Sequence, residues 1–277
     1  MMNAMQARYE LAQVVARRAG EKALEMFRQR DSLVIESKGL QDMVSIADRD
    51  TELLIRAEVQ ASFPEDGFLG EEGGLERADA RFLWVIDPID GTACFVNGMH
   101  AWCLSIGVLC EGKPVIGVVY DPNSDEMFHA LGGHGAFVNT TALQVAPATA
   151  LSEGVLGVGF SHRVPVSAFI PFLNRTLSDG GMFIRNGSGA LMLAYVAAGR
   201  LIGYYEPHIN AWDCMAGIVL VREAGGRVND FLSGEGLLQG NPIIAAGANL
   251  YPTLVATIDP AHGDVPSPQP QTLAVFV

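Results

Sequence analysis

The chain has 277 residues, 49% of them hydrophobic, so it can bury a large core as one fold or as two closely packed halves. Its 31 acidic and 18 basic residues give a net charge of −13, which argues against nucleic acid as a partner because phosphate-backbone affinity comes from clustered Lys and Arg. The four cysteines form no CxxC pair, and neither a membrane-length apolar run nor a signal peptide is present. We therefore expect a cytoplasmic protein that does not associate with membranes.

Two helices and a buried strand are predicted in the first part of the chain. Apolar residues recur every four positions over residues 4–30, which is typical of one face of a long helix. Ser45 and Asp48 have the spacing of a helix start, so a second helix is expected from Ser45 to about Ser62. A polar, turn-rich stretch follows, and then the apolar run FLWVI at 82–86 predicts a strand covered on both faces.

The remaining elements divide the chain into two halves near residue 150. Short apolar runs separated by turn residues over 103–138 predict antiparallel hairpins. Beyond residue 155, strands alternate with helices near 165–179, near 188–198, from about 212 to 224 and from about 249, which predicts a sheet covered by helices. We expect a single fold over residues 1–262, with halves 1–150 and 151–262, and a Pro-rich irregular tail at 263–277.

The motif WVIDPIDGT at 84–92 places two aspartates directly after the buried strand. In a continuing strand Asp87 and Asp90 would point to opposite faces, but Pro88 and Gly91 favour a turn that brings both carboxylates together. Adjacent carboxylates raise each other's pKa unless a cation lies between them. The motif therefore predicts a site for a divalent cation such as Mg²⁺, with the backbone carbonyl of Ile89 as a further oxygen ligand.

Other acidic residues stand in similar settings. They are Asp48, Glu71 in GEEGG at 70–74, and Asp213 in AWDCMAG, where an apolar context makes an unpaired carboxylate costly. Ordinary alternatives exist: a turn for Asp87 and Asp90, a solvated loop for Glu71, and a helix cap for Asp213. Several carboxylates around two or three cations would form a phosphate-ester site. Backbone N–H groups of Gly91, Thr92 and Ala93 would then hold phosphate oxygens, and Thr92 would orient the attacking water.

These motifs resemble those of the Mg²⁺-dependent, lithium-sensitive inositol monophosphatase family, which belongs to the superfamily of fructose-1,6-bisphosphatase. The resemblance rests on 70–74, 84–92 and 212–226, in family order and at family spacing. It implies an α+β or α/β fold built as a layered αβαβα sandwich, commonly a homodimer. It also implies that a small phosphorylated substrate, such as a polyol or sugar phosphate, is hydrolysed by a water molecule activated by two or three Mg²⁺ ions.

The resemblance assigns roles to residues of this chain. Glu71, Asp87 and the carbonyl of Ile89 match the ligands of a first metal ion, and Asp87, Asp90 and Asp213 those of a second. Glu71 and Thr92 match the residues that activate water, with Asp48 as an outer helper, and Gly91 to Ala93 match the phosphate-binding turn. The residues that match substrate contacts are Asp90, Ser188, Gly189, Glu206 and Asp213.

The departures from the family pattern leave the substrate open. Ala93, Cys94 and Asn97 replace the usual Thr, Asn and His, and Ile202 replaces an Asp. The alternatives are a histidinol-phosphate phosphatase and a 3′(2′),5′-bisphosphate phosphatase; the latter would need a basic pocket, for which Arg163, Arg185 and Arg200 are candidates. A non-enzymatic alternative is a regulatory binding protein on the same fold, since some bacterial relatives associate with the transcription machinery. That alternative predicts a damaged ligand set or a basic face, and the sequence has neither.

Overall fold

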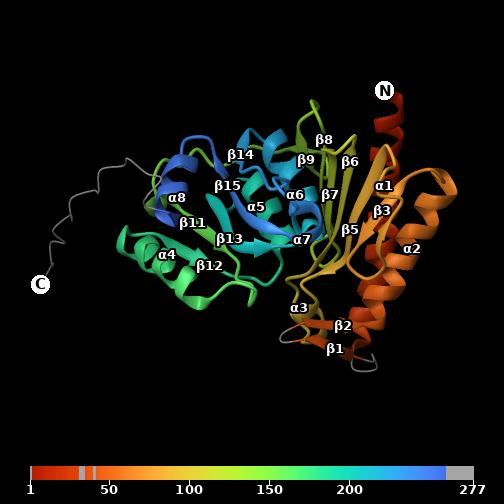
Figure 1. The fold of residues 1–277 in the computed structure, drawn as a ribbon, viewed down its shortest axis with the longest axis horizontal. Coiled ribbons are helices and arrows are strands. Elements are labelled where there is room, and N and C mark those ends of the chain that lie inside the picture. Colours follow the sequence, from red (N-terminus) through yellow and green to blue (C-terminus); the bar gives the residue numbers. More distant parts are fainter. Residues whose placement is uncertain (1, 31–34, 40–41, 260–277) are drawn as a thin grey trace, which may run out of the picture.

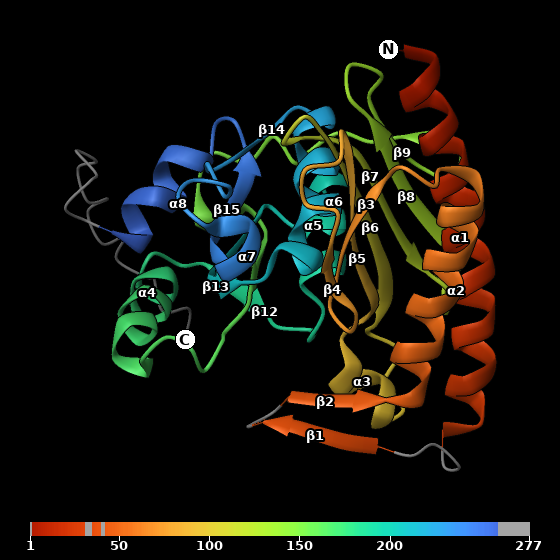
Figure 2. The same ribbon diagram turned by 45° about the vertical axis from the view of Figure 1, so that its right-hand side comes forward.

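Two β-sheets alternate with three layers of helices (Figure 1). The structure is a computed structural model that describes residues 2–30, 35–39 and 42–259. Helices α1 and α2 cover one face of the first sheet, α5 and α6 lie between the two sheets, and α4 and α8 cover the outer face of the second sheet (Figures 1 and 2). This is the layered αβαβα sandwich that the motifs implied.

The first sheet has eight strands and comes from the first half of the chain. Their spatial order is β10-β9-β8-β7-β6-β5-β3-β4, and β3 runs parallel to β5 while the other neighbours are antiparallel. The bounds are β3 Gly67–Gly70, β4 Gly74–Glu76, β5 Phe82–Asp90, β6 Cys103–Cys110, β7 Lys113–Asp121, β8 Glu126–Leu131, β9 Ala136–Val138 and β10 Thr141–Ala142. Strands β1 Ile35–Gly39 and β2 Asp42–Ser45 pair antiparallel in a separate two-stranded sheet.

The second sheet has five strands in the order β12-β11-β13-β15-β14. Strand β11 pairs in parallel with β12 and β13, whereas β15 is antiparallel to β13 and β14. The bounds are β11 Val155–Val158, β12 Met182–Ile184, β13 Gly203–Ile209, β14 Gly226–Val228 and β15 Asn241–Gly247. The helices are α1 Met2–Arg28, α2 Ile46–Ser62, α3 Thr92–Val96, α4 Val166–Ser178, α5 Gly189–Ala197, α6 Ala211–Glu223, α7 Gly236–Gln239 and α8 Tyr251–Ile258, with a 3₁₀ turn at Leu151–Glu153.

Most of the predicted elements are confirmed, but two predictions about the first sheet are wrong. The polar stretch after α2 contains β3 and β4, and β3 is fully buried between β4 and β5. Four residues are too few to show a strand's alternation, so only the neighbouring strands identify β3. Strand β5 also continues through Pro88 instead of ending at Asp87. The predicted tail at 263–277 lies outside the described residues.

Helix α6 approaches the first sheet closely because glycines face it. A Cβ atom on Gly107 would lie 2.6 Å from the Cβ of Met215, and one on Gly117 would lie 2.3 Å from the carbonyl oxygen of Ala216. The helix is apolar on nearly all sides, as expected for a helix between two sheets. This close packing fixes the start of α6 against the end of β5. No helix among the described residues is long and apolar enough to span a membrane.

A buried ion pair ties α1 to the first sheet. Arg8 donates two hydrogen bonds to Asp66, from Nε at 2.7 Å and from a terminal nitrogen at 2.6 Å, and the indole N–H of Trp84 donates to the same carboxylate at 2.8 Å. The Arg8 guanidinium also lies over the rings of Phe63 and Phe82. Because Asp66 is 2% exposed, loss of its charge would leave a buried cation without its partner.

We expect the substitution Asp66→Asn to lower the free energy of unfolding by about 3–5 kcal/mol, the usual cost of breaking a buried ion pair from one side. Urea denaturation followed by circular dichroism measures this change. The matched control is Asp125→Asn, which removes an exposed partner of Arg17 and should cost less than about 1 kcal/mol. Equal effects of the two substitutions would contradict the structural role of the buried pair.

Candidate functional site

A β-bulge turns Asp87 and Asp90 to the same side of β5. Asp87 pairs with Ser105 and Asp90 pairs with Cys103, so three steps along β5 match two steps along β6. The extra residue reverses the alternation, and Pro88 fits this irregular position because it has no N–H to donate. The N–H of Ile89 donates instead to the Asp87 carboxylate at 2.9 Å. The two carboxylates therefore converge as expected, but through a bulge within the strand.

Asp213 joins them from the first turn of α6. Its carboxylate accepts hydrogen bonds from the backbone N–H of Asn210 at 3.1 Å and from the side-chain amide of Asn210 at 3.4 Å. It is therefore part of a helix cap and also faces the end of β5. One carboxylate oxygen from each of Asp87, Asp90 and Asp213 lies within 4.8 Å of the other two. These three residues, which we call the acidic cluster, offer oxygen ligands of the kind that Mg²⁺ prefers.

Burial raises the pKa of every member of the acidic cluster, and repulsion by neighbouring carboxylates adds to it at Asp87 and Asp90. Burial is the main cause for Asp87, whose pKa lies well above its usual value, and the charges of Glu71, Asp90 and Asp213 raise it further. Burial and the charge of Asp213 raise the pKa of Asp90 to about 7. The pKa of Asp213 is also raised by burial. The cluster therefore binds protons, or positive charge supplied from elsewhere, more readily than isolated carboxylates do.

The start of α5 holds Asp90 in place. The Ser188 hydroxyl and the Ala190 N–H each donate to Oδ2 of Asp90 at 2.6 Å, and Ser188 also caps the helix by accepting the N–H of Leu191 at 3.1 Å. Gly189 lies at the same junction, where an added Cβ would be 3.8 Å from the Cβ of Asp213. The structure thus brings the predicted residues Ser188 and Gly189 into the site.

The turn after β5 places Thr92 beside Asp48. Gly91 has a φ of 95°, a left-handed conformation that suits glycine, and it begins the short helix α3. The hydroxyl of Thr92 lies 3.1 Å from Oδ1 of Asp48 and 3.1 Å from the carbonyl oxygen of Ile89, so its one proton can go to either acceptor. Asp48, on α2, is 1% exposed. Ala93 is exposed in the first turn of α3.

Glu71 and Glu206 interact electrostatically with members of the acidic cluster. The N–H of Glu71 donates to the carbonyl oxygen of Ile86 at 3.2 Å, and its side chain acts electrostatically on Asp87. Burial, followed by the charges of Asp213 and Asp90, raises the pKa of Glu206 to about 8 even though the Tyr204 hydroxyl donates to it at 2.6 Å. Glu206 is therefore mainly neutral at pH 7.

The three arginines considered as a basic pocket do not act together. The charge of Arg163 favours the ionised form of Asp213, and that of Arg185 favours the ionised form of Glu206. Arg200 instead forms an ion pair with Glu126. Two arginines therefore act on the site.

Sequence reasoning missed three residues around the site. Tyr204 contacts Glu206, while Glu52 and Arg56 lie buried on α2 below the turn that carries Glu71. The four-residue spacing of Asp48, Glu52 and Arg56 on one face of a predicted helix was the available signal.

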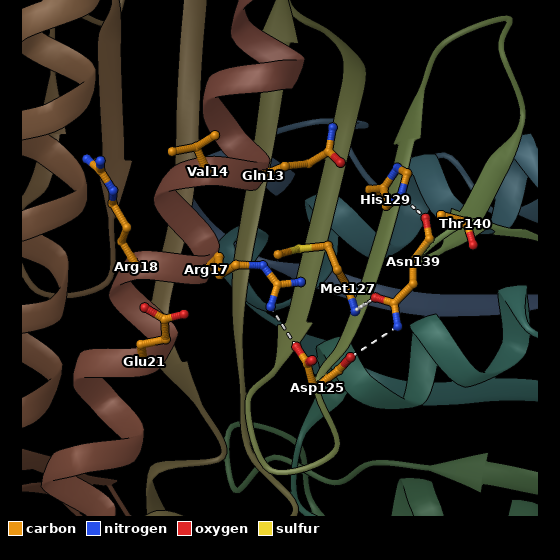
Figure 3. A pocket seen from close by; sticks show the side chains of 10 residues that line it. All are labelled: Gln13, Val14, Arg17, Arg18, Glu21, Asp125, Met127, His129, Asn139 and Thr140. Carbon is orange, nitrogen blue, oxygen red and sulfur yellow. Dashed lines mark hydrogen bonds and ion pairs between the residues drawn. The ribbon is translucent and has the colours of Figure 1, made fainter.

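A hollow of about 490 Å³ lies away from the acidic cluster, between α1 and the strands β8 and β9 (Figure 3). Its lining includes Arg17, Arg18, Glu21 and Asp125, and it contains no member of the cluster. Arg17 is paired with Asp125 at 2.7 Å, so its charge is already balanced (Figure 3). The hollow therefore does not contribute to the candidate site.

Comparisons with known proteins extend over nearly the whole chain. Residues 4–262 match the profile described as the inositol monophosphatase family. Nus factor SuhB of Haemophilus influenzae is 37% identical over 251 residues, which cover 90% of this chain and 94% of that protein. Inositol-1-monophosphatase of Mesorhizobium japonicum is 37% identical over 246 residues, covering 88% and 92%. The crystal structure of extragenic suppressor protein suhB from Bartonella henselae has a TM-score of 0.86 at 34% identity, covering 91% and 98%.

Because the pKa of Asp90 is raised from 3.8 to about 7, its contribution to stability is fully present below about pH 4 and is lost as the pH rises through about 7. Between these pH values the folded wild type binds about one proton more than the unfolded chain, so its free energy of unfolding falls by up to about 1.4 kcal/mol per pH unit on account of Asp90. We expect Asp90→Asn to remove this part of the fall. Urea denaturation with a chelator at several pH values measures the slope.

The exposed carboxylate of Asp125 provides the control for this experiment, since Asp125→Asn removes an acid outside the cluster. The free energy of unfolding of Asp125→Asn should fall with rising pH at least as steeply as that of the wild type. A slope in Asp90→Asn equal to that of the wild type would contradict the raised pKa.

Proposed function

Because this chain belongs to the inositol monophosphatase family, we propose that it is a Mg²⁺-dependent phosphomonoesterase acting on a small polyol or sugar phosphate, such as inositol 1-phosphate. The observation that carries this proposal is the convergence of Asp87, Asp90 and Asp213 within 4.8 Å of one another. We further propose that the protein is cytoplasmic and that it forms a homodimer, the oligomer common in the family.

The donor set of the site fits divalent cations. It consists of carboxylate oxygens with raised pKa values and the Ile89 carbonyl, which retains at least one lone pair whether or not it accepts the Thr92 proton. We assign Glu71, Asp87 and the Ile89 carbonyl to one Mg²⁺ and Asp87, Asp90 and Asp213 to another. When bound, these ions would supply the positive charge that polarises the phosphate ester and acidifies water.

In the proposed reaction, Glu71 and Thr92 hold the attacking water. When the Thr92 hydroxyl donates its proton to Asp48, its lone pairs face outward and can accept a hydrogen bond from water. The Glu71 carboxylate accepts the other proton and so increases the nucleophilicity of the water oxygen. Asp48 thus acts through Thr92 by fixing the direction of its hydroxyl proton. The reaction needs no covalent enzyme intermediate.

The substrate is held by backbone donors and by Glu206. The N–H groups of Gly91, Thr92 and Ala93 lie at a helix start, where they have no partner within the helix, so they suit phosphate oxygens. Ser188 and Gly189 border the same space from α5. Glu206 interacts electrostatically with Asp213 and Asp90 at the edge of the cluster, and its carboxyl group can bind a substrate hydroxyl as a donor when protonated or as an acceptor when ionised.

Two observations bear on the alternatives. Arg163 and Arg185 act on Asp213 and Glu206, which keeps a histidinol phosphate or a 3′(2′),5′-bisphosphate among the candidate substrates. Several relatives are called Nus factor SuhB, which keeps a regulatory protein on the same fold as the non-enzymatic alternative. The complete set of clustered carboxylates favours an enzyme, because a purely regulatory protein has no need to retain it.

We expect the wild type to release phosphate from at least one member of a panel of inositol, histidinol, sugar and nucleotide phosphates with Mg²⁺, and to lose this activity with a chelator. Asp90→Asn should lower kcat by at least about 100-fold while leaving the fold intact, because the substitution removes a ligand charge at the reacting centre. A phosphate-release assay and circular dichroism measure both effects.

Asp125→Asn is the matched control, since it removes an exposed carboxylate far from the cluster. Wild-type turnover by Asp90→Asn, or phosphate release that is insensitive to the chelator, would contradict the proposed function.

We expect Glu206→Ala to raise KM for a polyol phosphate by about 10-fold or more, because it removes a partner of a substrate hydroxyl. Hydrolysis of p-nitrophenyl phosphate, whose leaving group has no free hydroxyl, should change by less than about twofold. Glu206→Gln should stay close to the wild type at pH 7, since Gln retains a neutral donor. Equal losses on both substrates would contradict a role in hydroxyl recognition.

A further inference from the structure

Helix α2 carries a row of buried ionisable side chains on the face that packs against the first sheet. Asp48, Glu52 and Arg56 follow one another at four-residue spacing, and they are 1%, 2% and 7% exposed. Residues four apart lie above one another on a helix, about 6 Å apart along its axis. Asp48 contacts Thr92, as described above. The other two residues contact a different part of the site.

Glu52 binds the turn between β3 and β4, the turn that carries Glu71. Its Oε2 accepts the backbone N–H of Glu72 at 2.9 Å, and its Oε1 accepts the N–H of Gly73 at 2.9 Å. Arg56 donates from Nε to the same Oε1 at 2.8 Å. Two consecutive N–H groups on one carboxylate define the position and orientation of the turn closely.

Arg56 binds the other arm of this turn. Its two terminal nitrogens donate to the carbonyl oxygen of Gly74 at 3.0 Å and to the Glu76 carboxylate at 2.9 Å, and the guanidinium lies over the Phe68 ring. The side chains of Glu52 and Arg56 leave no room for a side chain at position 73. A Cβ on Gly73 would lie 2.6 Å from Oε1 of Glu52 and 2.7 Å from Cζ of Arg56.

The turn is thus held directly beside the acidic cluster. In the parallel pairing of β3 with β5, Gly70 lies opposite Ile86, and the N–H of Glu71 donates to the Ile86 carbonyl oxygen. Glu71, the first residue after β3, therefore lies beside Asp87, the next residue of β5. Its carboxylate lies close enough to Asp87 for the two side chains to interact electrostatically. A rotation of the turn about β3 would move the Glu71 carboxylate away from Asp87 without breaking the strand pairing.

We propose that Glu52 and Arg56 are positioning residues that hold the β3–β4 turn so that the Glu71 carboxylate faces Asp87 and completes the cation site. This inference rests on the proposed function for the role of Glu71. Helix α2 then fixes both partners of the attacking water, Thr92 through Asp48 and Glu71 through Glu52, on one rigid element. An ion pair that only stabilised the hairpin would leave cation affinity unchanged in the folded protein.

The test measures Mg²⁺ binding by isothermal titration calorimetry, without any phosphate ester. We expect Glu52→Gln to weaken Mg²⁺ binding by about 10- to 100-fold, the usual effect of losing a residue that orients a metal ligand. Amide hydrogen exchange at Glu72 and Gly73 should become faster. The matched control is Glu58→Gln on the same helix, which breaks an ion pair with Arg18 at 3.0 Å outside the site and should leave both readouts unchanged.

Two further variants test the positioning role independently of Glu52→Gln. Gly73→Ala displaces Glu52 and Arg56 without removing a charge, and the backbone at Gly73 is not left-handed, so it should weaken Mg²⁺ binding even if Glu52→Gln does not fold. In a Glu71→Gln background, Glu52→Gln should change Mg²⁺ affinity by less than about twofold, because the ligand it positions is already altered. Wild-type affinity in the folded Glu52→Gln or Gly73→Ala variant overturns the inference, as does an undiminished effect of Glu52→Gln in the Glu71→Gln background.

This design separates the inference from the proposed function. A wild type that binds Mg²⁺ but hydrolyses no ester of the panel would overturn the function, while the binding measurements would still decide the role of Glu52. A wild type that hydrolyses an ester, together with unchanged affinity in Glu52→Gln, would overturn the positioning role alone.

Discussion

The repulsion among three carboxylates at the end of one strand is the constraint on which the rest of the site depends. Asp87, Asp90 and Asp213 lie within 4.8 Å of one another, and burial raises the pKa of each. Such an arrangement is costly in the absence of protons or cations, so a fold that keeps it must hold the three side chains firmly. A bulge in β5, the cap of α6 and the start of α5 each hold one part of the cluster.

The layered architecture makes this convergence possible. The first sheet packs against the middle layer of helices (Figure 2). The site lies at this junction, where a strand end and two helix starts supply its side chains. Glycines at 107 and 117 let α6 lie close to the sheet, which brings Asp213 within reach of Asp87. Helix α2, on the opposite face of the sheet, supplies Asp48 and Glu52 from the other side. The chemistry therefore depends on the spacing between layers as much as on the acidic residues themselves.

The electrostatics of the site also favour a small anionic ester over a large polyanion. The chain is strongly acidic overall, and in its described part Arg163 and Arg185 bring positive charge to bear on the site. Burial, with the charges of Asp213 and Asp90, raises the pKa of Glu206 to about 8, which lowers its negative charge at pH 7 as long as no cation offsets those charges. An anion can bind here once cations reverse the sign of the acidic cluster. In the proposed reaction, this balance links the recognition of the ester to the same ions that assist its hydrolysis.

The sequence by itself determined the helices, the hairpins and the alternating second half, because hydrophobic periodicity and turn residues are local signals. Its motifs also marked the acidic residues, since charges next to apolar runs are conspicuous. Only the tertiary structure decided that β3 is a strand, that β5 passes through Pro88 with a bulge, and that Glu52 holds the turn carrying Glu71. Strand pairing, register and side-chain hydrogen bonds between distant segments depend on which elements become neighbours, and that information is absent from any short stretch of the chain.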